Sequence, residues 1–191
     1  THSHISIPPA PFDKGELDFV VLSGSNFEDS KNNIALAKDN PKLLATVGIH
    51  PMEKIFNLQF TIYNLEELLK NNKNIVAVGE CGLDYSESNP TTRLGNRVPP
   101  LDRARQRNLF IKQIELAIKY KKPLIVHSRK AMDETIEILK SYKNLTGVIH
   151  CYTGGIKRIK NVPESFYFGI DGNVTYEEGL VEVVKNIPKD R

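Results

Sequence analysis

The sequence has no tryptophan, two methionines and only two cysteines among its 191 residues. The cysteines, Cys81 and Cys151, are too few for a disulfide framework, and lone thiols favour a reducing compartment such as the cytoplasm. The sequence also lacks any run of about eighteen apolar residues, so we expect no membrane-spanning helix and no membrane partner.

A strong excess of one charge is absent as well. The net charge is +3, from 26 Lys and Arg residues against 23 Asp and Glu residues, and this balance neither requires nor excludes a nucleic-acid partner. With 40% hydrophobic and 26% charged residues, the composition is that of a soluble globular domain with a sizeable core. We therefore treat residues 1–191 as one domain.

The most informative stretch is Ile75–Tyr85, with the sequence IVAVGECGLDY. Its first four residues form an apolar run bounded by glycine, which predicts a strand covered on both faces, as in a parallel sheet with helices outside. Glu80 then follows at the expected strand end. Because an ionised carboxylate is rarely buried without a partner, Glu80 either pairs with a cation, caps a helix or belongs to a functional site.

Strands and helices alternate along the rest of the chain. We expect further strands near residues 1–5 and at 19–22, 44–49, 123–126, 147–149 and 166–170. We expect helices at 28–40, 64–72, 102–120, 131–142, 156–161 and 176–186. A loop at 86–100, rich in Pro, Asn and Arg, is long enough to indicate a functional surface. Seven strands in this alternation predict a parallel α/β fold.

All histidines of the chain lie at predicted strand ends, as Glu80 does. They are His2, His4, His50, His127 and His150. His2 and His4 are two positions apart, with Ser3 between them, so a strand would point both imidazoles to one side, as a divalent metal requires. A doubly wound sheet builds its ligand site from few strands, whereas a closed barrel gathers all its strand ends around one mouth. The distribution over five strands therefore favours a TIM-like (β/α)8 barrel.

The motifs around these residues resemble those of the TatD family of metal-dependent hydrolases, within the amidohydrolase-like barrels. They are His2-Ser3-His4, Gly48-Ile49-His50-Pro51, GECGLDY at 79–85, Val126-His127-Ser128-Arg129 and HCYTGG at 150–155, and the resemblance runs nearly from Thr1 to Arg191. It implies a set of metal ligands: His2, His4, Glu80, His127 and His150. It also implies that Glu80 bridges two ions and that His50 lines the active site. We take Glu80 and His50 as the catalytic residues.

The sequence departs from the family pattern in two places. The family has an acidic residue just before the His-x-His pair, where this chain has Thr1 as its first residue. The family also has an aspartate at the end of its last strand, and residues 189–191 look like the lead-in to that strand. We therefore expect the chain to lack the last strand and helix of the barrel. The proline-rich segment 6–17 predicts either an irregular first crossover or a second gap, and with the gap the domain would be incomplete at both ends.

Imidazole and carboxylate ligands suit Zn²⁺, Mn²⁺ or Mg²⁺, as one or two ions per chain. Two such ions can clamp the attacking and leaving oxygens of a phosphodiester, so the leading hypothesis is a deoxyribonuclease with DNA or another nucleic acid as its substrate. Two alternatives stay open: an ester or amide hydrolase such as a D-aminoacyl-tRNA deacylase, and a barrel that binds metal or nucleic acid without turnover. For the oligomeric state we favour a monomer.

Three residues beside the predicted site are candidates for substrate binding. Arg129 can contact a phosphate through two hydrogen bonds, or can form an ordinary ion pair. Tyr85 and Tyr152 follow site residues and can stack on bases. Basic residues at 157–160 add positive charge near the expected mouth, although a solvent-exposed helix face explains them equally well.

Overall fold

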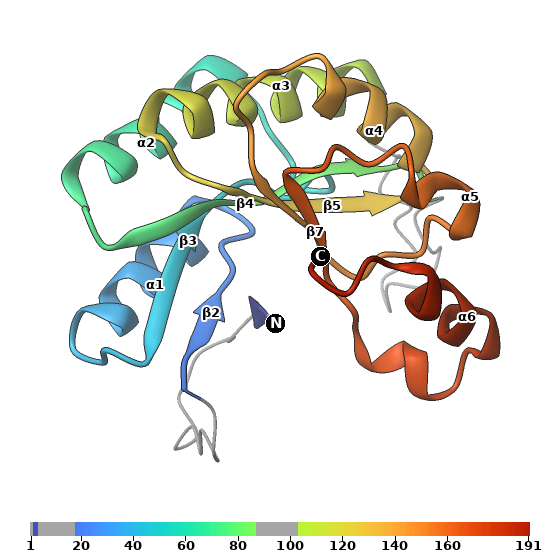
Figure 1. Cartoon of the computed structure of the whole chain (residues 1–191). Coiled ribbons are helices and arrows are strands. Elements are labelled where there is room, and N and C mark those ends of the chain that lie inside the picture. Colours follow the sequence, from blue (N-terminus) through green and yellow to red (C-terminus); the bar gives the residue numbers. More distant parts are fainter. Residues whose placement is uncertain (1, 4–17, 87–102) are drawn as a thin grey trace, which may run out of the picture.

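The computed structural model describes residues 2–3, 18–86 and 103–191. Within these residues, seven parallel strands form one sheet in the order of the sequence. The strands are β1 (His2–Ser3), β2 (Val20–Leu22), β3 (Leu43–Val47), β4 (Ile75–Asp84), β5 (Leu124–Arg129), β6 (Gly147–Ile149) and β7 (Phe166–Phe168). The sheet curls into a half-barrel (Figure 1), which confirms the predicted parallel α/β fold and is consistent with a TIM-like barrel.

From β2 on, each described strand is followed by a helix. These helices are α1 (Phe27–Lys38), α2 (Leu58–Asn71), α3 (Arg103–Tyr120), α4 (Met132–Lys140), α5 (Ile156–Ile159) and α6 (Glu178–Asn186), with a short 3-10 helix, η1 (Gly172–Thr175), before α6. In Figure 1, α2, α3 and α4 cover the convex face of the sheet. In the part of the chain that the structure describes, no helix is both long and apolar enough to cross a membrane.

The largest correction to the predicted helices concerns α2, which begins at Leu58 rather than at residue 64. The side chain of Asn57 accepts a hydrogen bond from the backbone N–H of Phe60 at 3.0 Å and so caps the first turn. Leu65 and Leu69 are buried, as their spacing predicted. The predicted gap at 6–17 and nearly all of the predicted loop at 86–100 lie outside the described residues.

Strand β4 also differs from the prediction, because it does not end at Glu80 but continues to Asp84. The glycines that were interpreted as the end of the strand lie inside it. The pairing of β4 with β5 shifts its register between Val78 and Cys81, which is the signature of a β-bulge. Past the bulge, Gly82 pairs with His127 and Asp84 with Arg129. The strand therefore presents two carboxylates, rather than one, near the carboxyl end of the sheet.

The core lies between the sheet and its outer helices, and α3 packs against β4 at its centre. Phe110 and Ile114 of α3 are fully buried in the same cluster as Val78 and Leu83 of β4. This packing fixes α3 directly behind the strand that carries Glu80. The position of α3 matters below, because two of its buried residues are polar.

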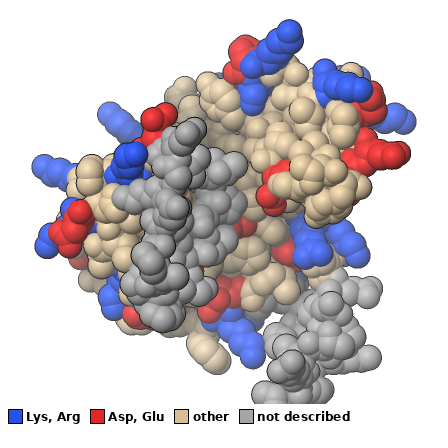
Figure 2. All heavy atoms as spheres, turned by 90° about the horizontal axis from the view of Figure 1, so that it is seen from below, with Lys and Arg blue, Asp and Glu red and all other residues tan. Residues whose placement is uncertain are grey.

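The face seen in Figure 2 carries charges of both signs. On this face, the described Lys and Arg side chains lie beside Asp and Glu side chains and do not gather into one basic patch. In α5, the guanidinium of Arg158 forms two hydrogen bonds to the carboxylate of Asp133, at 2.5 and 2.6 Å. One of the basic residues predicted after β6 is therefore paired with a local carboxylate.

Candidate metal centre and active site

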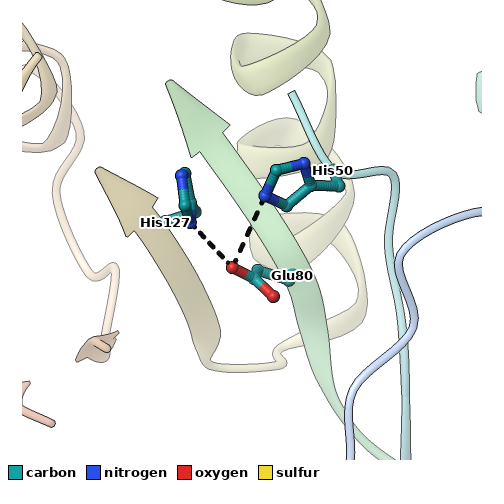
Figure 3. A group of neighbouring side chains, drawn as sticks. All are labelled: His50, Glu80 and His127. Atoms are coloured by element: carbon teal, nitrogen blue, oxygen red, sulfur yellow. Dashed lines mark hydrogen bonds and ion pairs between the residues drawn. The ribbon is translucent and has the colours of Figure 1, made fainter. Parts of the chain in front are cut away.

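Four of the six residues predicted at the mouth come together around one carboxylate oxygen. Glu80 lies on β4, His127 on β5, and His50 and His150 follow β3 and β6. Oε1 of Glu80 lies 2.5 Å from Nε2 of His150, 2.9 Å from Nδ1 of His127 and 3.7 Å from Nε2 of His50. Figure 3 shows His50 and His127 approaching this oxygen from the two neighbouring segments. Glu80 itself is only 2% exposed, so its carboxylate is largely removed from water.

His127 lies between two carboxylates. Its Nδ1 faces Glu80, and its Nε2 lies 3.0 Å from Oδ2 of Asp84. Because the ionised carboxylate of Asp84 only accepts hydrogen bonds, Nε2 of His127 donates to it, while Nδ1 is the nitrogen that faces Glu80. Burial lowers the pKa of His127, but the hydrogen bonds to Asp84 and Glu80 outweigh it and raise that pKa to about 9. In this arrangement Nδ1 is the ring nitrogen that faces the other ligand candidates.

Asp84 is the functional residue that the sequence interpretation left out. Burial raises its pKa, but hydrogen bonds from His127 and Ser86 outweigh this and hold that pKa at about 2, so Asp84 is ionised. One of these bonds comes from the Ser86 backbone N–H to Oδ1, at 2.9 Å. A metal-binding histidine commonly gives its second N–H to a carboxylate, which fixes the orientation of the ring. The available signal was the i, i+4 spacing of the two acids in a continuous strand.

The imidazole of His50 is oriented by the backbone. The N–H of Met52 donates to Nδ1 of His50 at 3.2 Å, so Nδ1 carries no proton and a neutral ring carries its proton on Nε2. The candidate ligand atoms of His50, Glu80 and His127 lie within 4.8 Å of one another, which by distance would allow all three to hold one ion. The hydrogen bond from Met52 instead makes Nε2 a donor, which suits contact with a substrate oxygen.

A cavity of about 1040 Å³ opens above this cluster. Its polar wall includes Glu80, His127 and His150, and its apolar wall includes Val21 and Val148. Such a mixed lining, with few polar groups that converge on one point, is typical of a binding site for a small group or a metal. Glu80, His127 and His150 supply nitrogen and oxygen donors that suit Zn²⁺ or Mn²⁺, so the residues present fit a divalent ion.

The residues predicted to bind substrate differ in their accessibility. Arg129 is exposed at the end of β5. Tyr85 is half-buried: its hydroxyl donates to Glu134 at 2.9 Å, and the guanidinium of Arg103 lies 4.4 Å from the centre of its ring. Tyr152 is only 2% exposed and packs edge-on against a phenylalanine of β7, so its ring faces the core and offers no surface for a base.

The remaining predicted residues are only partly described. His2 belongs to β1 and pairs with β2, but its side chain is not described, and His4 lies outside the described residues. Cys81 is fully buried, which raises the pKa of its thiol and makes it a small apolar residue of the core. Both cysteines are free thiols.

Comparisons with known proteins agree on one family. Residues 7–191 match the family described as TatD related DNase. An uncharacterized metal-dependent hydrolase of Buchnera aphidicola (subspecies Acyrthosiphon pisum) is 34% identical over 177 residues, covering 87% of this chain and 62% of that protein. The deoxyribonuclease Tat-D of Schizosaccharomyces pombe is 29% identical over 185 residues, covering 90% of this chain and 56% of that protein.

A solved structure shows the same arrangement of strands and helices. The crystal structure of YJJV, a TatD homologue of Escherichia coli, matches with a TM-score of 0.77 and 26% identity, covering 90% of this chain and 64% of that one. The chain thus spans less than two thirds of the length of each of these relatives. Because the family match extends over nearly all of its residues, the chain belongs to the TatD family of metal-dependent hydrolases.

Proposed function

We propose that the protein is a metal-dependent deoxyribonuclease that hydrolyses phosphodiester bonds. The observation that carries the proposal is the convergence of His127 and His150 on one oxygen of the buried Glu80 carboxylate, with His50 beside them. The nuclease name of a relative supports phosphodiesters over other esters. Because the chain spans less than two thirds of the length of these relatives, the activity is proposed and not inferred from their names alone.

Each residue has a separate role in this proposal. Glu80, His127 and His150 hold the ion or ions, and the family resemblance adds His2 and His4. A bound divalent ion supplies a hydroxide nucleophile near neutral pH and neutralises charge on the phosphate. His50 donates from Nε2 to a phosphate or leaving-group oxygen, because the Met52 amide occupies its Nδ1. Arg129, exposed beside the mouth, binds a flanking phosphate.

The first test is metal dependence. We expect removal of divalent ions with a chelator to reduce cleavage of single-stranded DNA to background, and Zn²⁺, Mn²⁺ or Mg²⁺ to restore it. If the ion binds the folded state and not the unfolded state, it should also raise the free energy of unfolding. The increase is about 2.7 kcal/mol at an ion concentration about 100 times Kd. Thermal and urea denaturation, with and without each ion, measure this second effect.

The same preparation distinguishes the alternatives. A D-aminoacyl-tRNA assayed beside the DNA tests ester hydrolysis. Faster release of the amino acid than of nucleotides would favour the deacylase. Ion binding without either reaction would favour a binding protein, and cleavage that persists in chelator would contradict the proposed metal centre.

A second prediction concerns Asp84. We expect Asp84→Asn to weaken Mn²⁺ binding by about 10–100-fold, because the neutral amide no longer holds the His127 imidazole as an anion does. Isothermal titration calorimetry measures the change. Asp133→Asn is the matched control, since that exposed carboxylate pairs with Arg158 and has no contact with the site. Equal Mn²⁺ affinity of Asp84→Asn and the wild type would exclude the orienting role.

We also propose that the protein acts in the cytoplasm as a monomer. The motivation for the compartment is that both thiols are free, one of them in the core. Light scattering of the full-length protein during gel filtration tests the oligomeric state, and a stable dimer would contradict it. Fractionation of the source cells tests the compartment.

A further inference from the structure

Helix α3 buries two glutamines that the proposed mechanism does not use. Gln106 is 2% exposed and Gln113 is fully buried. They are seven residues apart, so they lie two turns apart on the same side of the helix. Buried amides need hydrogen-bond partners, because an unpaired one costs free energy in the core. The partners of these two amides are not in α3.

Each glutamine pairs with the backbone of one residue on the sheet side. Oε1 of Gln113 accepts from the N–H of Ile49 at 2.8 Å, and its Nε2 donates to the carbonyl of Ile49 at 3.0 Å. Oε1 of Gln106 accepts from the N–H of Asp84 at 2.8 Å, and its Nε2 donates to the carbonyl of Asp84 at 2.9 Å. Each side chain thus replaces the two hydrogen bonds that a neighbouring strand would provide.

The two residues whose backbone the glutamines bind, Ile49 and Asp84, lie next to active-site side chains. Ile49 directly precedes His50, whose own backbone N–H donates to Ser25. Asp84 holds Nε2 of His127. The amide of Gln113 therefore fixes the backbone that presents His50, and the amide of Gln106 fixes the backbone that carries the Asp84 carboxylate. Satisfying buried backbone groups alone would not require both clamps to fall on these two segments.

We propose that Gln106 and Gln113 are positioning residues: α3 uses Gln106 to position the His127–Asp84 pair and, through a separate contact, uses Gln113 to position His50. Only the expected effect on the rate of DNA cleavage rests on the proposed function. It predicts different effects for the two residues. Gln106 acts through Asp84 on an ion-binding histidine, whereas Gln113 acts on a histidine that donates to substrate.

The variants Gln106→Met and Gln113→Met test the proposal, because methionine keeps the length of the side chain and removes both hydrogen bonds. For Gln106→Met we expect Mn²⁺ affinity to fall about 10–100-fold, as for other residues that orient metal-binding histidines. For Gln113→Met we expect Mn²⁺ affinity within about twofold of the wild type, but kcat for DNA cleavage to fall at least about 10-fold.

A readout without metal or substrate makes the test independent of the nuclease proposal. In the metal-free protein we expect the larger shift of the imidazole ¹⁵N resonances at His127 in Gln106→Met and at His50 in Gln113→Met. Because the two rings are in contact, with their centres 4.5 Å apart, the other histidine should shift as well in each case, but by less. Ile114→Ala, at a fully buried apolar residue of the same helix, is the control for general loss of stability, measured by urea denaturation.

Three results would overturn the proposal. The first is that the imidazole resonances stay unchanged in both methionine variants, although these variants are destabilised at least as much as Ile114→Ala. Another is equal shifts of both histidines in all three variants, which would indicate a general loosening of the fold. The third is unchanged Mn²⁺ affinity in Gln106→Met. If a methionine variant does not fold, the Gln→Glu variant at that position takes its place in the same measurements. Glutamate keeps the acceptor oxygen and removes the N–H donor. If DNA is not cleaved at all, only the proposed function fails.

Discussion

Glu80→Ala is expected to abolish hydrolysis and to weaken Mn²⁺ binding by more than about 100-fold, since loss of an outer partner of a ligand alone costs about 10–100-fold. The reason is that Oε1 of Glu80 is the atom on which His127 and His150 converge. Without the carboxylate, the imidazoles lose the anion that they share, and Asp84, which lies on the far side of the His127 ring, is the carboxylate that remains. If Glu80 bridges two ions, calorimetry should show both lost together.

The companion variant Glu80→Gln separates charge from shape. Glutamine keeps the volume of the side chain, so we expect circular dichroism and the urea midpoint to stay close to the wild type while activity is lost. Glu137→Gln is the matched control, because Glu137 is an exposed carboxylate on α4. Wild-type turnover by purified, metal-depleted Glu80→Gln protein after addition of Mn²⁺ would exclude the proposed role.

The alternation of strands and helices could be predicted because it depends on local patterns. Apolar runs bounded by glycine or proline predicted the start of β5 and both ends of β6 to within a residue, although β5 continues to Arg129, three residues beyond its predicted end. The spacing of apolar residues predicted α3. The early start of α2 was missed because its first turn carries an exposed Phe60 and shows no apolar stripe. There the cap by Asn57 was the only local signal.

Site residues could be predicted where the residue type is unusual for its position in the sequence. They could not be predicted where the role depends on a contact with a residue that is distant in sequence. Histidines at strand ends pointed to His50, His127 and His150, which do meet at Glu80. Asp84 was not singled out because its partner is 43 residues away in sequence. Tyr152 has the right neighbour in sequence, but its side chain turns into the core and packs there.

The roles of the two glutamines of α3 were even harder to predict from the sequence. In sequence they are polar residues on a helix, which usually mark a solvated face. Their burial follows only from the tertiary structure, which places α3 behind β4 and leaves the backbone at Ile49 and Asp84 to pair with side chains. No periodicity could have indicated this, since the partners lie 64 and 22 residues away.

Gly82→Ala is expected to damage both the fold and the metal centre. Gly82 lies inside β4 at φ +141°, a conformation that other residues rarely adopt, and it pairs with His127 of β5. A Cβ at this position would lie 2.0 Å from the carbonyl oxygen of His127, with backbone atoms of the same residue at 2.9 and 3.0 Å. The methyl group has no flexible side chain to displace, so β4 and β5 must separate where His127 is presented.

The expected cost combines two effects. Backbone strain contributes about 1–3 kcal/mol and overpacking about 1–3 kcal/mol, so the free energy of unfolding should fall by about 2–6 kcal/mol, a large part of a typical domain's total of about 5–15 kcal/mol. Urea denaturation measures this fall, and Mn²⁺ titration of the folded fraction should show a weakened site.

Gly155→Ala is the matched control, because Gly155 also has a positive φ, +75°, but an added Cβ there meets nothing within 4 Å. That control isolates backbone strain from the clash. If Gly82→Ala loses no more stability than Gly155→Ala and binds Mn²⁺ like the wild type, then the close approach of β4 to His127 does not shape the site.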